Sequence, residues 1–149
     1  MSVLTDLKNT YLETSGHLQA MEMAARSPAS RDRWAKRRDV NDKAYFMLMF
    51  ANFEDHVTQN CERLISERKA SVGARKNKRA WSVLAVNRMK FMNKVGLLVD
   101  KGGVNYNSVD QKYAIRCDIA HGSFSTVGPV NILNEYLEFK RLLSALKPS

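Results

Sequence analysis

Residues 46–65 read FMLMFANFEDHVTQNCERLI and carry the clearest structural pattern of the chain. Their apolar positions recur every three or four residues, the spacing that places side chains on one face of an α-helix. The positions on this face are Phe46, Met49, Phe50, Phe53, Val57, Cys61, Leu64 and Ile65. The stretch therefore predicts a long central helix whose side chains form the core, with Asn41 or Asp42 as its N-terminal cap.

The segments before this helix predict another long helix and a basic connection. Apolar residues within 4–25 keep the helical period, and Pro28 is expected to end that first helix. Residues 31–38 read RDRWAKRR and place five basic residues around Trp34. This basic stretch fits either a short helix or an exposed connector.

The segments after the central helix complete the predicted bundle. Residues 69–79 are rich in Lys, Arg, Ser and Gly, which indicates a mobile basic loop. Residues 81–99 have apolar side chains on more than one face and predict a third long helix that is buried on two sides. Gly102 and Gly103 would terminate it.

Two further helices are expected near the C-terminus. A short helix begins at Asn107 or Ser108, and Gly122 would stop it as a left-handed cap. Gly128 and Pro129 would open the last helix, whose expected inward residues are Leu133, Tyr136, Leu137, Leu143 and Leu146. The predicted fold is all-α: an up-and-down bundle of four long helices plus a short motif helix, forming a single domain over residues 1–149.

Composition limits the classes of function and location. The chain has 149 residues and a formal net charge of +9 at pH 7, which attracts polyanions such as nucleic acid. Its two cysteines, Cys61 and Cys117, form neither a zinc-ligand pattern nor a disulfide framework, which favours a reduced setting. No metal or other cofactor is expected. No apolar run is long enough to cross a bilayer and no secretion signal is evident, so we expect a cytoplasmic protein without a membrane partner.

The strongest chemical signal is RCDIAHG, residues 116–122, which sets an arginine five residues before a histidine. Arginine is a permanent cation whose forked donors suit phosphate oxygens, and histidine exchanges protons near neutral pH. The pair is therefore a candidate for cleaving a phosphodiester in RNA, with His121 as the base that activates the 2′-hydroxyl and Arg116 holding the phosphate. The alternative is structural: Arg116 in a surface ion pair and His121 at a helix C-terminus, where its charged form is favoured.

One helix cannot bring these two side chains together. Residues five apart on an α-helix point roughly 140° from each other. Two copies related by a twofold axis could each contribute an Arg and a His to one groove, so the motif favours a homodimer.

The motif resembles that of HEPN ribonucleases, whose arginine and histidine are separated by about four to six residues and often end in Ala-His-Gly, as Ala120-His121-Gly122 does. Phe53-Glu54 is similar to the Phe-Glu or Leu-Glu pair that several subfamilies carry on a central helix. The resemblance implies a HEPN-like bundle and a composite site between two domains. Its products would be a 2′,3′-cyclic phosphate and a 5′-hydroxyl.

The resemblance also implies a biological setting and further site residues. Such domains serve as toxins or antiphage effectors, so an antitoxin or a nucleotidyltransferase is a possible partner protein. Glu54 would line the groove and support the side chains of the motif. The family has Asn, Asp or His directly after the arginine, whereas this chain has Cys117 there and Asp118 one place later. Cys117 is a candidate for the same supporting role. Asp118 is a candidate for orienting His121 or Arg116, or else a solvated carboxylate.

Basic residues around the two tryptophans are candidates for RNA binding, because cations contact phosphates and an aromatic ring can stack on an unpaired base. The candidates are Arg33, Trp34, Lys36, Arg37, Arg38, Arg75, Lys76, Lys78 and Arg79. Ordinary solvated charge is the simpler interpretation of the same residues.

Two other functions remain open from the sequence. The first is a HEPN-like module without catalysis that binds RNA or nucleotide, or that pairs with a nucleotidyltransferase. The second is a DNA-binding helical protein, for which the chain offers basic helices but no recognition-helix pattern.

Overall fold

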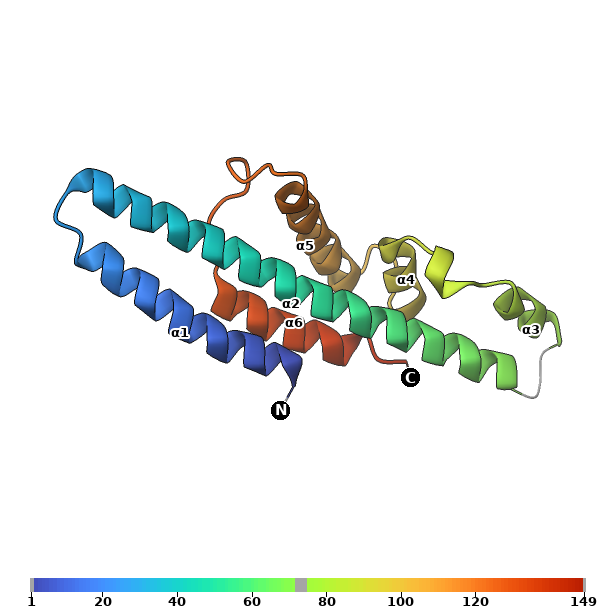
Figure 1. Cartoon of the computed structure of the whole chain (residues 1–149). Helices are drawn as coiled ribbons and strands as arrows, with labels where there is room; N and C mark the ends of the chain where they lie inside the picture. The colour runs from blue at the N-terminus through green and yellow to red at the C-terminus, as the bar shows by residue number, and fades with distance from the viewer. Residues whose placement is uncertain (1, 72–74, 149) are drawn as a thin grey trace. The chain divides into compact units, whose positions relative to one another are not determined.

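The computed structural model describes residues 2–71 and 75–148, with the backbone alone for 75–78. All regular structure in these residues is helical, which confirms the all-α class. The elements in chain order are α1 (Val3–Met23), α2 (Pro28–Ala70), α3 (Arg75–Ser82), a short 3-10 helix η1 (Val86–Arg88), α4 (Phe91–Leu98), α5 (Val104–Ala120) and α6 (Ile132–Ala145) (Figure 1).

The described residues group into two compact units. The first comprises residues 1–52 and 113–140, and the second comprises residues 53–112 and 141–149. Helices α2, α5 and α6 each contribute residues to both units. A single domain over residues 1–149 therefore stays a prediction.

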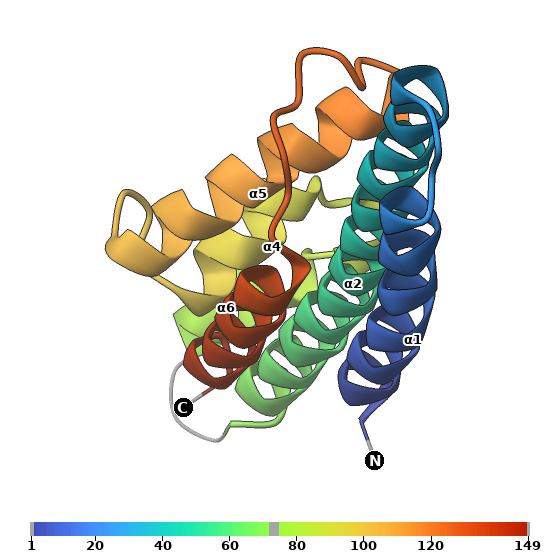
Figure 2. The same ribbon diagram turned by 90° about the vertical axis from the view of Figure 1, so that its left-hand side faces the viewer.

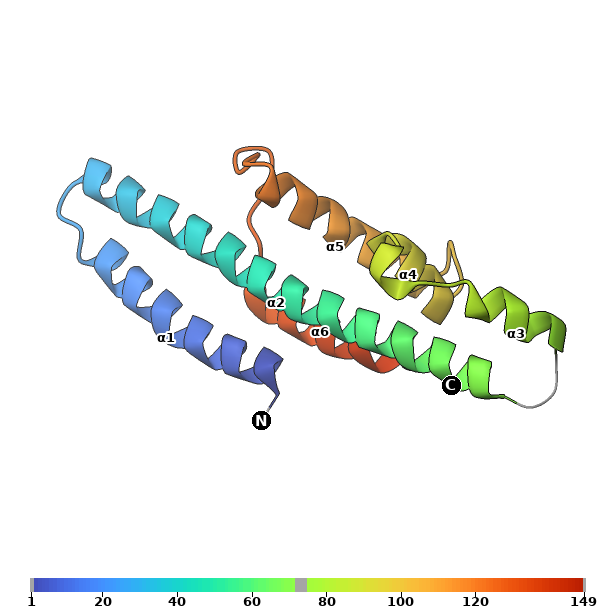
Figure 3. The ribbon, with the colours of Figure 1, turned by 45° about the vertical axis from the view of Figure 1, so that its right-hand side comes forward.

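In the first unit, α1 and the beginning of α2 form an antiparallel hairpin and lie side by side (Figures 1 and 3). The Ser27 side chain caps α2 by accepting the Ser30 N–H at 3.1 Å, and Pro28 is the first helical residue, where its missing N–H costs nothing. Pro28 therefore opens α2, and the prediction that it ends the first helix is wrong, because α1 already ends at Met23.

The predicted N-terminal cap at Asn41 or Asp42 is also wrong, because α2 runs without a break from Pro28 to Ala70 and includes the basic stretch 31–38. Asp42 instead accepts a hydrogen bond from the Tyr11 hydroxyl at 3.0 Å. Burial raises the pKa of the Asp42 carboxyl, although the Tyr11 bond opposes that change. The Tyr11–Asp42 hydrogen bond therefore joins α1 to α2, and Leu4 is the residue of α1 that is buried.

The core of the first unit is aromatic. The Phe139 ring lies 5.9 Å from that of Phe46 and 6.1 Å from that of Phe50, centroid to centroid, and Phe50 stacks on Tyr113 at 6.2 Å. Helix α6 enters this core through Ile132, Tyr136 and Phe139, all buried.

The inward face predicted for the last helix is confirmed in part, because Tyr136 and Leu146 are buried and Leu143 is half-buried. Leu133 and Leu137 were expected to face inward, but their side chains are 43% and 62% exposed. The helix also begins at Ile132 rather than at Gly128 and Pro129, because the Asn131 side chain caps it by accepting the Asn134 N–H at 3.0 Å.

In the second unit, the C-terminal part of α2 packs against α4. The Phe53 and Phe91 rings meet edge to face at 6.4 Å, and the Cys61 thiol donates to the Lys94 carbonyl oxygen at 3.2 Å. Burial raises the pKa of that thiol to about 11. Cys61 is therefore an inert packing residue near neutral pH.

The prediction of a third long helix over 81–99 is wrong. That segment contains the end of α3, the 3-10 helix η1 and the short helix α4, which bury Val86, Phe91 and Val95. The apolar residues of 81–99 do not share one helical face, because each short element directs its own apolar side chains into the core. The predicted loop over 69–79 is wrong at both ends, since α2 extends to Ala70 and α3 begins at Arg75, while 72–74 lie outside the described residues.

Helix α5 is longer than the short motif helix expected from Asn107 or Ser108, because it starts at Val104. The Asn107 side chain donates from its amide nitrogen to the Gly102 carbonyl oxygen at 3.0 Å. The long helices are therefore α1, α2, α5 and α6, and the motif belongs to one of them.

Candidate functional site

The end of α5 fixes the backbone of the motif. The His121 N–H continues the helical pattern to the Cys117 oxygen at 3.0 Å. Gly122 then turns into the left-handed region with φ 79°, as the sequence predicts. Its N–H bonds the Ile119 oxygen at 3.0 Å, and the Ser123 N–H bonds the Asp118 oxygen at 2.9 Å. These two bonds form a Schellman cap, so the helix stops in a defined geometry directly after the histidine.

The side chains of Arg116 and His121 are separate groups. Arg116 is half-buried and His121 is exposed. Neither side chain makes a hydrogen bond or ion pair with any residue that the structure describes. Because five residues separate them, they point roughly 140° apart on the helix. One copy of the chain therefore offers an unengaged cation and an unengaged imidazole that do not meet.

The two residues between them have different surroundings. Cys117 is a free, half-buried thiol. Asp118 is exposed, and its carboxylate bonds neither Arg116 nor His121 in the described part of the chain. Asp118 instead lines a cavity of about 240 Å³ with the loop that follows α5. Its orienting role toward His121 or Arg116 stays a prediction.

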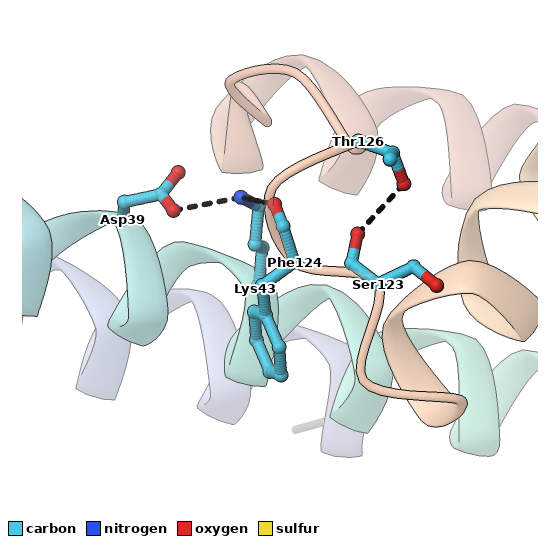
Figure 4. A network of polar contacts seen from close by, with 5 residues as sticks. All are labelled: Asp39, Lys43, Ser123, Phe124 and Thr126. Carbon is cyan, nitrogen blue, oxygen red and sulfur yellow. Dashed lines mark hydrogen bonds and ion pairs between the residues drawn. The ribbon is translucent and has the colours of Figure 1, made fainter.

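A buried lysine anchors the loop that follows the motif (Figure 4). Lys43 on α2 is 2% exposed, and its Nζ donates to Asp39 Oδ2 at 2.7 Å and to the Phe124 carbonyl oxygen at 2.8 Å. The same Nζ lies 5.8 Å from the centroid of the Phe124 ring. A buried ammonium is tolerated only when it is paired and hydrogen-bonded, so these contacts hold the loop against α2 just after His121.

Replacing Lys43 with methionine is expected to lower the free energy of unfolding by about 1–3 kcal/mol, because the Phe124 carbonyl loses its buried donor. Asp39 is partly exposed and can be hydrated when its partner is lost. Urea unfolding measures the stability, and limited proteolysis measures opening of residues 123–131. Lys36 is an exposed lysine on the same helix, so Lys36→Met should change neither the stability nor the proteolysis. Wild-type stability and protease resistance in Lys43→Met would contradict the anchoring role.

The remaining supporting residue, Glu54, belongs to the second unit. Its side chain is half-buried, and its backbone oxygen accepts the Thr58 hydroxyl at 3.0 Å. Its predicted support of the motif stays a prediction.

The basic stretch at the start of α2 presents an exposed surface. Arg33, Lys36 and Arg37 are exposed, whereas Trp34 is half-buried, with the Arg37 guanidinium 4.5 Å from the centre of its ring. That contact occupies one face of the indole, so phosphate contacts by the cations suit this surface better than base stacking on Trp34.

Two other groups of predicted RNA-binding residues differ from this surface. Arg38 is engaged in an ion pair with Glu22 at 2.6 Å, and the Glu22 hydrogen bond raises the Arg38 pKa. Arg79 on α3 is exposed, while the side chains of Arg75, Lys76 and Lys78 lie outside the described residues. RNA binding by all of these residues stays a prediction.

Lys43 and the cavity beside Asp118 were not recognised in the sequence. The sequence does contain a signal that Lys43 is buried. Lys43 precedes Phe46 and Phe50 at helical spacing, so its charge falls on the apolar face of α2. Asp39, four residues earlier, is the partner that this position requires. The cavity has no such signal, because it depends on the path of the loop.

Metal sites and membrane-spanning helices were also considered among the described residues. Among the described residues, no group of His, Cys, Asp or Glu is arranged to hold a metal ion. No described helix has the length and apolar character needed to cross a membrane. Comparison with family models, curated proteins and solved structures gives no match to this chain.

Proposed function

We propose that the protein is a metal-independent RNA endonuclease of HEPN type that acts as a homodimer, with Arg116 of one copy and His121 of the other in each site. The observation that carries the proposal is that both side chains lie at the end of α5 without a partner in the described part of the chain. They are therefore available to a phosphate and to a proton in transfer. The resemblance of RCDIAHG to HEPN motifs favours RNA as the substrate.

RNA carries its own nucleophile, so the reaction needs only proton transfer and charge stabilisation. His121 takes the proton of the 2′-hydroxyl as that oxygen bonds to phosphorus, and the bond from phosphorus to the 5′-oxygen breaks. The leaving 5′-oxygen takes a proton from water. Arg116 binds the phosphate oxygens as their negative charge increases. The products are a 2′,3′-cyclic phosphate and a 5′-hydroxyl.

The charge of the chain supports an RNA substrate. The net charge of +9 and the exposed Arg33, Lys36 and Arg37 attract a polyanion and give affinity that falls as salt rises. We extend the proposal, by the same resemblance, to a cytoplasmic toxin or antiphage effector. A neutralising protein or a nucleotidyltransferase would then be its partner.

One observation favours a second candidate, a HEPN-like module that binds RNA or nucleotide without cleaving it. Cys117 follows the motif arginine where HEPN ribonucleases have a polar residue, and the Asp118 carboxylate makes no hydrogen bond or ion pair with Arg116 or His121 in the described part of the chain. The histidine then lacks a side chain that orients its ring. Binding of RNA without cleavage would support this candidate.

Complementation between two inactive variants tests the composite site. Arg116→Ala and His121→Ala chains with different affinity tags are co-expressed, and the heterodimer is purified through both tags. Each variant alone should be inactive, whereas the heterodimer should regain about half of the wild-type rate, because one of its two symmetric sites has both residues.

Two outcomes would contradict different parts of the proposal. A heterodimer as inactive as its parents, beside an active wild type, would exclude a site shared between copies in this way. A wild-type protein that binds RNA and does not cut it would exclude the nuclease itself.

A further inference from the structure

The cavity beside the motif lies between the C-terminal part of α5 and the loop that leads to α6. In Figure 2 this loop leaves the end of α5 and then runs down to the start of α6. The cavity is open to solvent on one side and has a volume of about 240 Å³, which is below the range of roughly 300–1,000 Å³ for drug-sized ligands and suits a single heterocycle. The lining residues are Ile115, Asp118, Thr126, Val127, Gly128, Pro129, Val130, Asn131 and Glu135.

The lining of the cavity is acidic and apolar, although the chain as a whole is basic. The described lining contains Asp118 and Glu135 and no lysine or arginine, although the protein has 24 such cations. Ile115, Val127 and Val130 provide apolar surface. Carboxylates repel a phosphate and accept hydrogen bonds, so the cavity suits a flat, uncharged group that carries N–H donors.

The position of Asp118 connects the cavity to the motif. Asp118 stands three residues before His121 at the end of the same helix, a spacing that makes side chains neighbours, with Cβ atoms about 5–6 Å apart. A base held at Asp118 would have its own ribose close to the imidazole. The Lys43 contact to Phe124 restrains the loop that carries Val127 and Val130.

We propose that this cavity is a base-binding subsite that takes a guanine of an RNA strand. Guanine presents two adjacent donors, N1–H and the 2-amino group, which match the two oxygens of the Asp118 carboxylate. Adenine, cytosine and uracil do not offer two neighbouring donors on that edge. Glu135 interacts with another residue of the protein, so Asp118 is the main recognition group. The role of the subsite in choosing a cleavage point rests on the proposed nuclease function, whereas base binding does not.

Nuclear magnetic resonance titration of the labelled protein with the four nucleoside 3′-monophosphates tests the binding. The four ligands carry equal charge, so attraction to the basic surface is common to all of them. We expect 3′-GMP to bind at least about tenfold more tightly than the others, a difference of about 1.4 kcal/mol. The largest shifts should be at Asp118, Val127 and Val130.

Asp118→Asn is the informative variant, because it replaces one acceptor oxygen by a donor of similar size. It should abolish the preference for 3′-GMP, whereas Asp110→Asn, which neutralises an exposed carboxylate on the same helix outside the cavity, should retain it. Equal binding of all four nucleotides, or an unchanged preference in Asp118→Asn, would overturn the subsite. Shifts at these residues caused by an arginine-containing peptide and not by 3′-GMP would assign the cavity to a protein ligand and overturn it as well.

Cleavage mapping separates this inference from the proposed function. If guanine preference is found but RNA is never cut, the subsite stands and the nuclease fails. If RNA is cut with no base preference, and Asp118→Asn leaves the cleavage pattern unchanged, the nuclease stands and the subsite fails.

Discussion

Replacing His121 with alanine is expected to slow RNA cleavage by about 10²–10⁴-fold, the range for removal of a general base. His121 is exposed and its imidazole makes no hydrogen bond or ion pair with the described part of the chain, so the substitution removes the base without opening a cavity in the core. The Schellman cap consists of backbone bonds and persists in the variant. Cleavage rates of a mixed-sequence RNA measure the effect, and thermal unfolding confirms that the fold is unchanged.

His17→Ala is the matched control. His17 is an exposed histidine on α1, and its loss should leave the cleavage rate within experimental error of the wild type. Equal loss of activity in both variants would indicate a general effect of charge. An active His121→Ala protein would exclude His121 as the base.

Phe139→Ala is expected to lower the free energy of unfolding by about 3–5 kcal/mol, the cost of a large cavity in an aromatic core. The Phe139 side chain is fully buried against the rings of Phe46 and Phe50. Leu137→Ala, two residues earlier on α6, should change stability by less than about 0.5 kcal/mol, because Leu137 is mostly exposed.

Urea unfolding of both variants distinguishes the observed face of α6 from the one that the leucine pattern predicts. A large loss of stability in Leu137→Ala together with a small loss of stability in Phe139→Ala would contradict the observed packing. If Phe139→Ala does not fold, Phe139→Leu provides a smaller volume change, and its loss should still exceed that of Leu137→Ala.

The central helix was the most predictable element. All eight apolar positions assigned to its face between residues 46 and 65 are buried. The prediction succeeded because aromatic and aliphatic residues repeat there at the helical period over five turns. Its beginning was placed wrongly, because Asn41 and Asp42 are good caps in isolation and the preceding basic stretch has no apolar period of its own. The pair Asp39–Lys43 shows that polar residues continue the helix through that region.

The prediction of one long helix over 81–99 was wrong for a different reason. It contains neither proline nor a glycine before Gly96, so its breaks have no local sequence signal. The backbone is extended at Ala85 and Lys90, and both lack a side-chain cap. Burial of Val86, Phe91 and Val95 within the second unit accompanies these breaks, and only tertiary structure reveals it.

At the candidate site, the end of the helix was predictable from the local sequence, whereas the contacts between distant residues were not. Gly122 marks the end of α5 because a left-handed residue after a helix is a local rule, and its φ of 79° confirms this. The Lys43 anchor joins residues 81 positions apart, and the cavity forms only when the loop returns to α6. No periodicity encodes such contacts.

The most direct measurement of the proposed activity is the chemistry of the RNA ends. Purified protein is incubated in EDTA with an RNA and with a DNA of the same sequence, and fragment masses are determined. The proposal predicts RNA fragments with 2′,3′-cyclic phosphate and 5′-hydroxyl ends, no cut in DNA, and strongly slowed formation of fragments by His121→Ala. Intact RNA, cleavage that disappears in EDTA, or 5′-phosphate ends would contradict it.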